Sequence, residues 1–238
     1  MPISLVRSYG LARRWAVDRI TGRHCLFASP TDQPEVCFES RILLRQNIMR
    51  TESYDAKLGN ISLAFSKLNN VVVQPGQIFS FWYLVGEPSK GNGYLLSRSL
   101  LNGKLVQDYG GGLCQLAGMI YHLSLLAGLK IMERHPHSRD IYQEHERFTP
   151  LGSDAAVAYG IKDLSMQNSL PSPIQFCFTI ENEQLAGRVC SMYAISERVI
   201  AFVRQDDVDS MRTVETYAVA GKSGRKLLAN SRYRIGAK

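Results

Sequence analysis

The hydrophobic positions in the N-terminal part of the chain repeat at helical spacing in two stretches. Between residues 3 and 20, apolar side chains recur every three or four positions and arginines fill the other side, which predicts an amphipathic helix with a solvated basic face. Residues 21–39 are polar and carry Pro30 and Pro34, so we expect a linker or irregular arm there. The helical spacing returns over residues 40–68 and predicts further helix.

Strand patterns follow, separated by turn residues. Residues 71–73 and 77–81 are rich in β-branched and aromatic side chains and flank a Pro-Gly turn, so they predict two short strands. Asn102-Gly103 lies between two apolar runs and predicts a hairpin. Further along, alternation of apolar and polar positions predicts strands at residues 155–159 and 174–180.

One helix pattern in the middle of the chain is apolar on nearly every side. It covers residues 113–126, directly after three consecutive glycines, and Gly128 stands where a C-cap glycine is expected. A helix of this composition belongs in the interior. Residues 129–133 then predict a strand, and residues 214–228 a terminal hairpin. Because helices and strands mix without a regular βαβ rhythm, the predicted class is α+β, with a mixed or antiparallel sheet packed around this buried helix.

Composition narrows the class of protein but not its function. The 238 residues are 45% hydrophobic and 21% charged, ordinary values for a globular chain that exclude a fibre or a disordered tail. The net charge of +7 favours anionic partners such as membranes, nucleic acid or wall polymers, without selecting one. No phosphate loop, dinucleotide fingerprint or helix-turn-helix arrangement stands out in the sequence, so we expect neither nucleic acid nor a cofactor as a partner.

Cysteine usage and the N-terminus both favour a cytoplasmic location. The five cysteines are scattered, odd in number and without CxxC spacing, which fits a reducing compartment better than a disulfide framework. Arginines interrupt every apolar run of the first 20 residues, so no signal peptide is predicted, and no stretch approaches the length of a membrane span. The basic helix within residues 1–20 is still a candidate for peripheral contact with the anionic inner face of the membrane, with a merely solvated surface as the alternative.

The most informative motif is Gly110-Gly111-Gly112-Leu113-Cys114-Gln115. Its three glycines permit backbone conformations that other residues avoid, and allow a ligand to approach the main chain closely. Cys114 falls in the first turn of the predicted buried helix, where unpaired amides and the positive end of the helix dipole stabilise a thiolate. The side-chain amide of Gln115 is a candidate oxyanion donor.

A nucleophilic cysteine needs a histidine from elsewhere in the fold. His122 lies about two turns further along the same helix, too far for contact. His137 follows the strand predicted at residues 129–133, and a helix that returns through a strand brings that strand's end back beside the helix start. Asp154 is a candidate to orient the His137 imidazole. The predicted catalytic set is therefore Cys114, His137, Asp154 and Gln115.

Two other interpretations of these residues stay open. Cysteine is among the most buried residue types, so Cys114 can equally be a small core residue of an apolar helix. Cys114, His135 and His137 would together suit zinc, but Pro136 separates the histidines and a fourth ligand is missing, so no metal site is predicted. His145 lies in a polar run and reads as a loop residue.

The predicted ligand-binding residues lie in and around the glycine motif. Phe79 and Phe81 are expected in the core, whereas Trp82 and Tyr83 are candidates for an aromatic platform under a sugar or peptide ligand. The predicted binding set is Gly110, Gly111, Gly112, Trp82, Tyr83 and Ser138.

A series of segments resembles the VanW family both in sequence and in order. The segments are Leu68-Asn69-Asn70, Pro75 to Trp82, Val85 to Pro88, Gly93-Tyr94, Asn102 to Lys104, Gly110 to Leu116, Glu133-Arg134, His137-Ser138 and Pro150 to Val157. They cover roughly residues 40–190. We therefore expect a basic helix and linker over residues 1–39, a VanW-like domain over 40–190 and a β-rich extension over 191–238. The family pattern has a Ser followed by a Thr or Asn where this chain has Ala117 and Gly118.

The resemblance implies an accessory role at the cell envelope, in peptidoglycan metabolism or glycopeptide resistance. Two hypotheses follow for the site. In the first, Cys114 is the nucleophile of a hydrolase or acyl transferase that acts on a cell-wall precursor or peptide-like ligand. In the second, the protein is a non-catalytic binding or scaffold module. Cys114 is then structural, and the basic helix docks on the inner membrane face or on a wall-synthesis partner.

Overall fold

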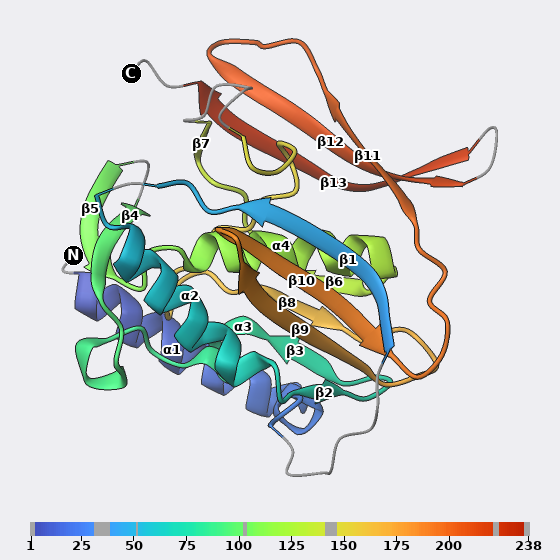
Figure 1. The fold of residues 1–238 in the computed structure, drawn as a ribbon, viewed down its shortest axis with the longest axis horizontal. Helices are drawn as coiled ribbons and strands as arrows, with labels where there is room; N and C mark the ends of the chain where they lie inside the picture. The colour runs from blue at the N-terminus through green and yellow to red at the C-terminus, as the bar shows by residue number, and fades with distance from the viewer. Residues whose placement is uncertain are drawn as a thin grey trace.

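The centre of the protein is a buried helix that packs against sheets and against a second helix (Figure 1). The structure is a computed structural model, and it describes residues 3–30, 39–50, 52–101, 104–140, 147–220 and 224–235. The central helix is α4 (Leu113–Ala127), in which Leu116, Met119, Ile120 and Leu123 are fully buried. It ends at Gly128, whose φ of 77° is the left-handed conformation of a C-cap glycine. These observations confirm the α+β class and the buried helix.

One antiparallel sheet packs against α4 and α2 (Tyr54–Leu68). Its strand order is β1–β10–β9–β2, with bounds Glu39–Asn47, Gln184–Ser191, Ile174–Glu181 and Val72–Val73. Along β9, Ile174, Phe176 and Phe178 are buried and alternate with half-buried positions, as the strand pattern predicts. On β10, Gly187 leaves room for the helix, because a Cβ there would stand 2.4 Å from the Met119 sulfur.

The helix predicted from residue 40 onward is wrong in its first part. Residues 39–47 form β1, which pairs with β10 along its whole length, and only α2 is helical. The short run Ile42-Leu43-Leu44 is compatible with either period, and in the structure Ile42 and Gln46 are buried while Leu43 is 40% exposed. Pairing with a distant strand therefore decided the local structure. The preceding arm contains a 3₁₀ turn, η1 (Arg23–Leu26), and residues 31–38 lie outside the described part.

Two smaller sheets complete the region around the glycine motif. β3 (Ile78–Ser80), β8 (Ser165–Gln167) and β6 (Lys130–Glu133) form one of them, and β4 (Leu96–Leu101) pairs with β5 (Lys104–Tyr109) in the other. The hairpin prediction is thus confirmed in its strands, although Asn102-Gly103 itself lies outside the described residues. The connection before β4 holds a short 3₁₀ helix, η2 (Lys90–Asn92).

Two strand predictions in this region need correction. The strand predicted over residues 77–81 ends at Ser80, whose hydroxyl accepts a hydrogen bond from the Tyr83 amide at 3.3 Å and caps a short helix, α3 (Phe81–Val85). Residues 155–159 form no strand beyond a bridge between Ala158 and Lys162. The loop before them instead passes with its backbone, at Ser153 to Ala155, beside Gly118 of α4. The strand of this region is β8, which its short sequence did not reveal.

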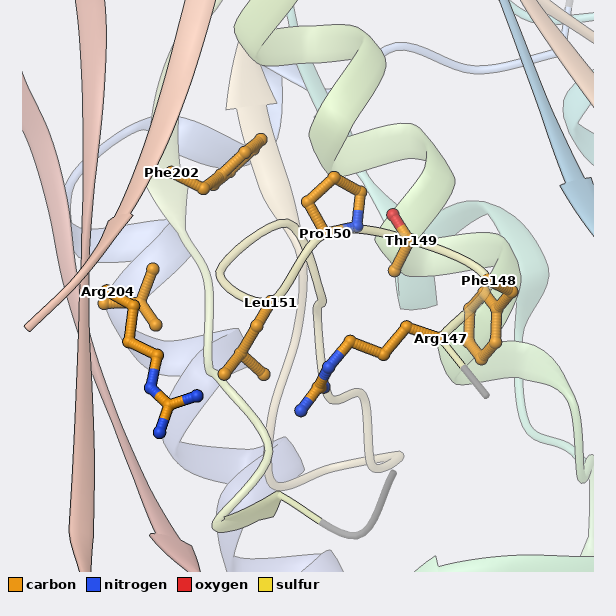
Figure 2. Close-up of a pocket in the computed structure, with 8 residues that line it drawn as sticks. Arg147, Phe148, Thr149, Pro150, Leu151, Phe202 and Arg204 are labelled. Atoms are coloured by element: carbon orange, nitrogen blue, oxygen red, sulfur yellow. The ribbon is translucent and has the colours of Figure 1, made fainter. Parts of the chain in front are cut away.

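The C-terminal residues form a sheet of their own on the far side of α4 from α1 (Figure 1). Its order is β11–β12–β13–β7, with bounds Val199–Arg204, Met211–Ala220, Gly224–Ile235 and Arg139–Asp140. The predicted terminal hairpin corresponds to β12 and β13, and β7 joins β13 in parallel. Figure 2 shows residues 147–151 between this sheet and α4, where they wall an open depression of about 620 Å³ with Phe202, Arg204 and Val214.

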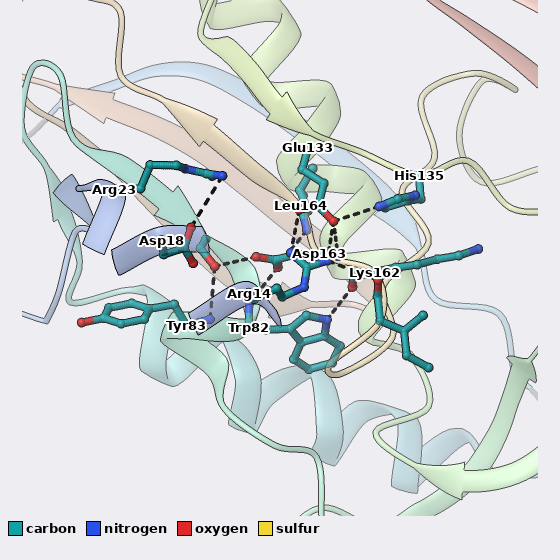
Figure 3. A network of polar contacts seen from close by, with 12 residues as sticks. Arg14, Asp18, Arg23, Trp82, Tyr83, Glu133, His135, Lys162, Asp163 and Leu164 are labelled. Carbon is teal, nitrogen blue, oxygen red and sulfur yellow. Dashed lines mark hydrogen bonds and ion pairs between the residues drawn. The ribbon is translucent and has the colours of Figure 1, made fainter. Parts of the chain in front are cut away.

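The N-terminal helix α1 (Ile3–Ile20) turns part of its basic side toward the protein. Arg14 binds both carboxylate oxygens of Glu133 at 2.6 and 2.7 Å (Figure 3). Arg7 pairs with Asp108 at 3.1 Å. Gly10 lies so close to the carbonyl of Gly160 that a Cβ would not fit. The expected solvated basic face is therefore wrong for Arg7 and Arg14.

Apolar side chains occupy much of the exposed side of α1. Tyr9, Trp15 and Ile20 are 68, 63 and 86% exposed. No helix in the described residues is long and apolar enough to span a bilayer.

Candidate active site

The glycine turn delivers Cys114 to the first turn of α4. Gly110 and Gly112 have φ angles of 84° and 100°, in the left-handed region that favours glycine. Gly112 is also crowded, because a Cβ there would lie 2.7 Å from Cγ of Lys57 and 3.0 Å from Cγ1 of Ile61. The motif thus needs glycine at these two positions for both conformation and space. Gly111 is not among the residues with positive φ.

His137 and Asp154 lie beside Cys114, as the sequence predicts. The His137 Nδ1 donates to Oδ2 of Asp154 at 2.7 Å, and the backbone amide of His137 donates to the same oxygen at 2.8 Å. The His137 side chain also interacts with the Cys114 thiol, and each group shifts the pKa of the other. The sulfur also lies 3.7 Å from the carbonyl oxygen of Val157. The three side chains form a Cys–His–Asp relay, although Asp154 stands on a loop and not on the strand expected there.

The electrostatics of the relay favour a thiolate beside an imidazolium. Burial raises the pKa of the Cys114 thiol, but the hydrogen bond and charge of His137 outweigh it, so that the pKa lies below its ordinary value. Burial lowers the pKa of His137, while the bonds to Asp154 and Cys114 raise it, with a net rise to about 10. Burial opposes ionisation of Asp154, yet His137 and Arg134 hold its pKa well below the usual range.

Two residues outside the predicted set hold Asp154 in place. Arg134 donates to Oδ1 of Asp154 at 2.9 Å and to its main-chain carbonyl at 2.8 Å, and its side chain is only 6% exposed. Tyr233, from β13, donates its hydroxyl to the same Oδ1 at 2.6 Å. Arg134 stands in a segment that carries the family resemblance, which is a signal for it. The sequence offers no signal for Tyr233, 79 residues from its partner.

The relay opens into a cavity of about 390 Å³. Gly110, Gly112, Gln115 and Trp82 line it together with the three relay residues. The other predicted binding residues, Gly111, Tyr83 and Ser138, do not line this cavity. The carbonyl of Gly111 accepts a bond from Asn60, Tyr83 stacks on Phe27 with 57% of its surface exposed, and Ser138 is exposed.

Trp82 and Gln115 are both fastened to neighbouring main chain. The indole Nε1 of Trp82 donates to the carbonyl of Lys162 at 2.8 Å, and the residue is part of the cavity lining. The amide nitrogen of Gln115 donates to the carbonyl of Asn47 at 3.0 Å and ties α4 to β1. Its Oε1 is buried without a hydrogen-bond partner among the described residues. The oxyanion role of Gln115 stays a prediction.

Two other histidines, His135 and His122, lie apart from the relay. His135 contacts Glu133 at 2.9 Å (Figure 3) and does not line the cavity beside Cys114. His122 packs edge-on against Phe202, and burial lowers its pKa to about 4. His145 is outside the described residues. Within the described ranges, no group of three or more His, Cys, Asp or Glu side chains is arranged to hold a metal ion.

Sequence comparison places this site within a known family. The sequence profile described as VanW like protein matches residues 56–190, more than half of the chain. This chain belongs to the VanW family. The vancomycin B-type resistance protein VanW of Enterococcus faecalis is 30% identical over 190 residues, which are 75% of this chain and 69% of that protein. No solved structure shows significant similarity to the chain.

A second VanW-family relative matches the chain more locally. The uncharacterized protein YoaR of Bacillus subtilis is 35% identical over 115 residues, which are 48% of this chain and 36% of YoaR. The segment that matches the family profile holds Cys114, Arg134, His137 and Asp154, whereas Tyr233 lies beyond it. Gly118, where the family pattern differs, lies on α4 beside the backbone of Asp154 and Ala155. A Cβ added at Gly118 would stand 3.5 Å from that backbone, an ordinary contact distance.

Proposed function

We propose that this VanW-family protein acts in cell-envelope metabolism or glycopeptide resistance as a cysteine-dependent hydrolase or acyl transferase on peptide-like wall substrates. The observation that carries the proposal is the Cys114–His137–Asp154 relay, which opens into a cavity at the start of a buried helix. A nucleophile, a base and an orienting carboxylate within hydrogen-bond reach are the parts that covalent catalysis requires. The link to resistance comes from the printed name of the Enterococcus relative.

The geometry supports a two-step acyl transfer. In the first step the Cys114 thiolate attacks the carbonyl carbon of a substrate amide, and the imidazolium of His137 gives its proton to the leaving amine. The products are a thioester on Cys114, a free amine and a neutral His137. In the second step His137 takes a proton from water or from an acceptor amine, which attacks the thioester and restores the thiolate–imidazolium pair. Asp154 keeps the Nδ1 proton in place throughout.

The start of α4 supplies positive potential where charge develops. The first amides of a helix have no intrahelical acceptor, and the helix dipole points its positive end at this turn. The amide of Cys114 is one of these groups, so it is our candidate oxyanion donor beside Gln115.

The proposal is tested by alkylation of Cys114 and by complementation. Iodoacetamide should modify Cys114 well below the pH at which N-acetylcysteine reacts, because a thiolate and not a thiol is the nucleophile. The modified peptide is quantified by mass spectrometry, with exposed Cys25 as an internal comparison. Cys114→Ser should fail to complement a deletion strain under glycopeptide stress, while Cys25→Ser complements it. A folded Cys114→Ser protein that complements fully would remove catalysis from the proposal.

We infer a second, non-catalytic candidate, in which α1 rests on an anionic membrane surface. Tyr9, Trp15 and Ile20 are exposed, and aromatic side chains of this kind settle at membrane interfaces. Arg13 and Arg19 are exposed on the same helix, and the guanidinium of Arg19 lies 5.2 Å from the centre of the Trp15 ring. These residues combine apolar area with positive charge.

Vesicle binding tests this second candidate. The protein should co-sediment with vesicles rich in anionic lipid at low salt and be released at high salt. Trp15→Ser and Ile20→Ser should weaken binding, whereas Tyr193→Ser, which removes an equally exposed aromatic elsewhere, should not. Equal binding to neutral vesicles would contradict the contribution of the arginines, and no binding to either would remove the membrane role.

A further inference from the structure

The cavity beside Cys114 carries more positive than negative charge that is free to meet a ligand. Each acidic side chain that lines it already holds a cation. The pairs are Asp108 with Arg7, Asp140 with Arg147 and Arg212, and Asp154 with Arg134 and His137. The described residues of the cavity therefore offer no unpaired carboxylate to an incoming cation. An anion, in contrast, would meet an unpaired positive charge.

Two cations that line the cavity have no ion-pair partner among the described residues: Arg139, which is exposed, and Lys57, which is half-buried. Lys57 lies on α2, and none of the described residues accepts a hydrogen bond from its ammonium. Its side chain is half-buried, and burial alone lowers its pKa to about 8, with no nearby carboxylate to oppose the shift. Removing a cation partly from water without an ion-pair partner costs free energy. A ligand anion that pairs with such a cation therefore gains a strong, charge-assisted hydrogen bond.

The stem of Lys57 packs on the turn that positions the nucleophile. Its Cγ lies 2.7 Å from where a Cβ on Gly112 would be, and Gly112 is two residues before Cys114. The absence of a side chain at Gly112 is what lets the lysine pass over the turn and line the same cavity as the sulfur. The glycine of the motif thus serves two groups, the backbone turn and the lysine.

We propose that Lys57 binds a carboxylate of the substrate, so that the cavity selects peptide-like molecules with a free carboxylate near the bond that Cys114 attacks. This inference rests on the proposed function and specifies its substrate class. No hydrogen bond or ion pair joins Lys57 to the relay among the described residues, and its role is to hold one end of the ligand while the relay acts at the other. Acyl donors without a negative charge would then be poorer ligands for this cavity.

Matched alkylating reagents test the charge preference without knowledge of the natural substrate. Iodoacetate and iodoacetamide deliver the same reactive carbon to Cys114, one with a carboxylate and the other with a neutral amide. Lys57→Met should lower the ratio of the iodoacetate rate to the iodoacetamide rate by about tenfold, the size expected for losing one charged hydrogen bond in a partly dry cavity. Lys130→Met, an equal change of charge on exposed β6, should leave the ratio unchanged.

A protection experiment gives a second measurement on the same variants. N-acetylglycine should slow the reaction of Cys114 with iodoacetamide in the wild-type protein, whereas the neutral N-acetylglycinamide should not. The protection should vanish in Lys57→Met and persist in Lys57→Arg, which keeps the positive charge.

The outcomes separate this inference from the proposed function. An unchanged rate ratio in a folded Lys57→Met protein, together with equal protection by the two glycine derivatives, would overturn the carboxylate site while leaving the activated cysteine intact. If Cys114 of the wild-type protein reacts with neither reagent below the pH of an ordinary thiol, the proposed function fails instead. If Lys57→Met and Lys130→Met lower the iodoacetate-to-iodoacetamide rate ratio equally, the net charge of the protein and not Lys57 is responsible. That result would also overturn the carboxylate site.

Discussion

Two histidines that are two residues apart, His135 and His137, each pair with a carboxylate, but the two pairs have different surroundings. His137 and Asp154 are both mostly buried, at 22 and 16% exposure, and their pair borders the Cys114 sulfur. His135 and Glu133 are more exposed, at 37 and 24%, and Glu133 is shared with Arg14 of the N-terminal helix. The first pair contacts the thiol of Cys114, and the second holds α1 through Arg14. What a histidine–carboxylate pair can do therefore depends on the third group beside it.

The course of the backbone explains why the side chains of His135 and His137 have different neighbours. The chain leaves β6 at Glu133 and runs alongside the loop of Asp154, with the amide of Ala156 donating to the carbonyl of His135 at 2.7 Å. Arg134 and His137 then face Asp154, while the imidazole of His135 turns back to Glu133. The zinc alternative needs His135 beside His137 and Cys114, whereas the two imidazoles bond different carboxylates.

The largest expected difference between the two pairs is in the reactivity of Cys114. His137→Asn should slow its alkylation by iodoacetamide at pH 6 by up to about a thousandfold, since an ordinary buried thiol is then ionised to about one part in a thousand. The wild-type rate should stay high as pH falls, because the pKa of Cys114 is lowered and His137 loses its proton only near pH 10. His135→Asn should leave the pH–rate profile unchanged. Equal effects of the two substitutions would contradict the assignment.

The next largest difference is expected when the two carboxylates are replaced, and it concerns the stability of the protein. Asp154→Asn removes the partner of Arg134, a guanidinium that is 6% exposed, and should cost about 3 kcal/mol of unfolding free energy. Glu133→Gln affects a more exposed pair and should cost about 1 kcal/mol, seen mainly as loosening of α1. Denaturant unfolding measures the first effect, and hydrogen exchange of residues 3–20 measures the second. A larger loss for Glu133→Gln would reverse the comparison.

The glycine turn provides a smaller and sharply local contrast. Gly112→Ala should destabilise the protein by about 2 kcal/mol, because it combines a left-handed backbone with contact to Lys57 and Ile61. Gly111→Ala should cost under about 1 kcal/mol, since Gly111 has no positive φ. Thermal melting compares the two variants. Equal melting temperatures would mean that the turn tolerates a Cβ at either position.

The smallest effect is expected where the C-terminal sheet meets the relay. Tyr233→Phe keeps the buried ring and removes the bond to Asp154, at a cost of about 1 kcal/mol. It should also slightly raise the pH below which Cys114 loses reactivity, because Asp154 then holds His137 less firmly. Tyr217→Phe, on the same sheet but bonded to Glu215, is the control and should not move that pH. Identical profiles for all three proteins would make Tyr233 a packing residue only.

Short-range sequence patterns determined the parts of the fold that depend on neighbours in the chain. The all-apolar pattern of residues 113–126 marked a buried helix, and the glycines before and after it marked its ends. Cys114, His137 and Asp154 followed from the chemistry of the residue types and from their order, and the structure brings them together.

The remaining features of the fold and of the site depend on contacts between segments that are distant in the sequence. Only the tertiary structure decided them. β1 is a strand because β10 pairs with it, and the inward side of α1 is set by Glu133 and Asp108, not by its own periodicity. The same holds for Tyr233 on Asp154 and for Lys57 over Gly112, contacts that span 79 and 55 residues of chain. A sequence pattern records which face of an element is apolar, but the partner of a buried polar group is chosen by the three-dimensional neighbours that exclude water from it.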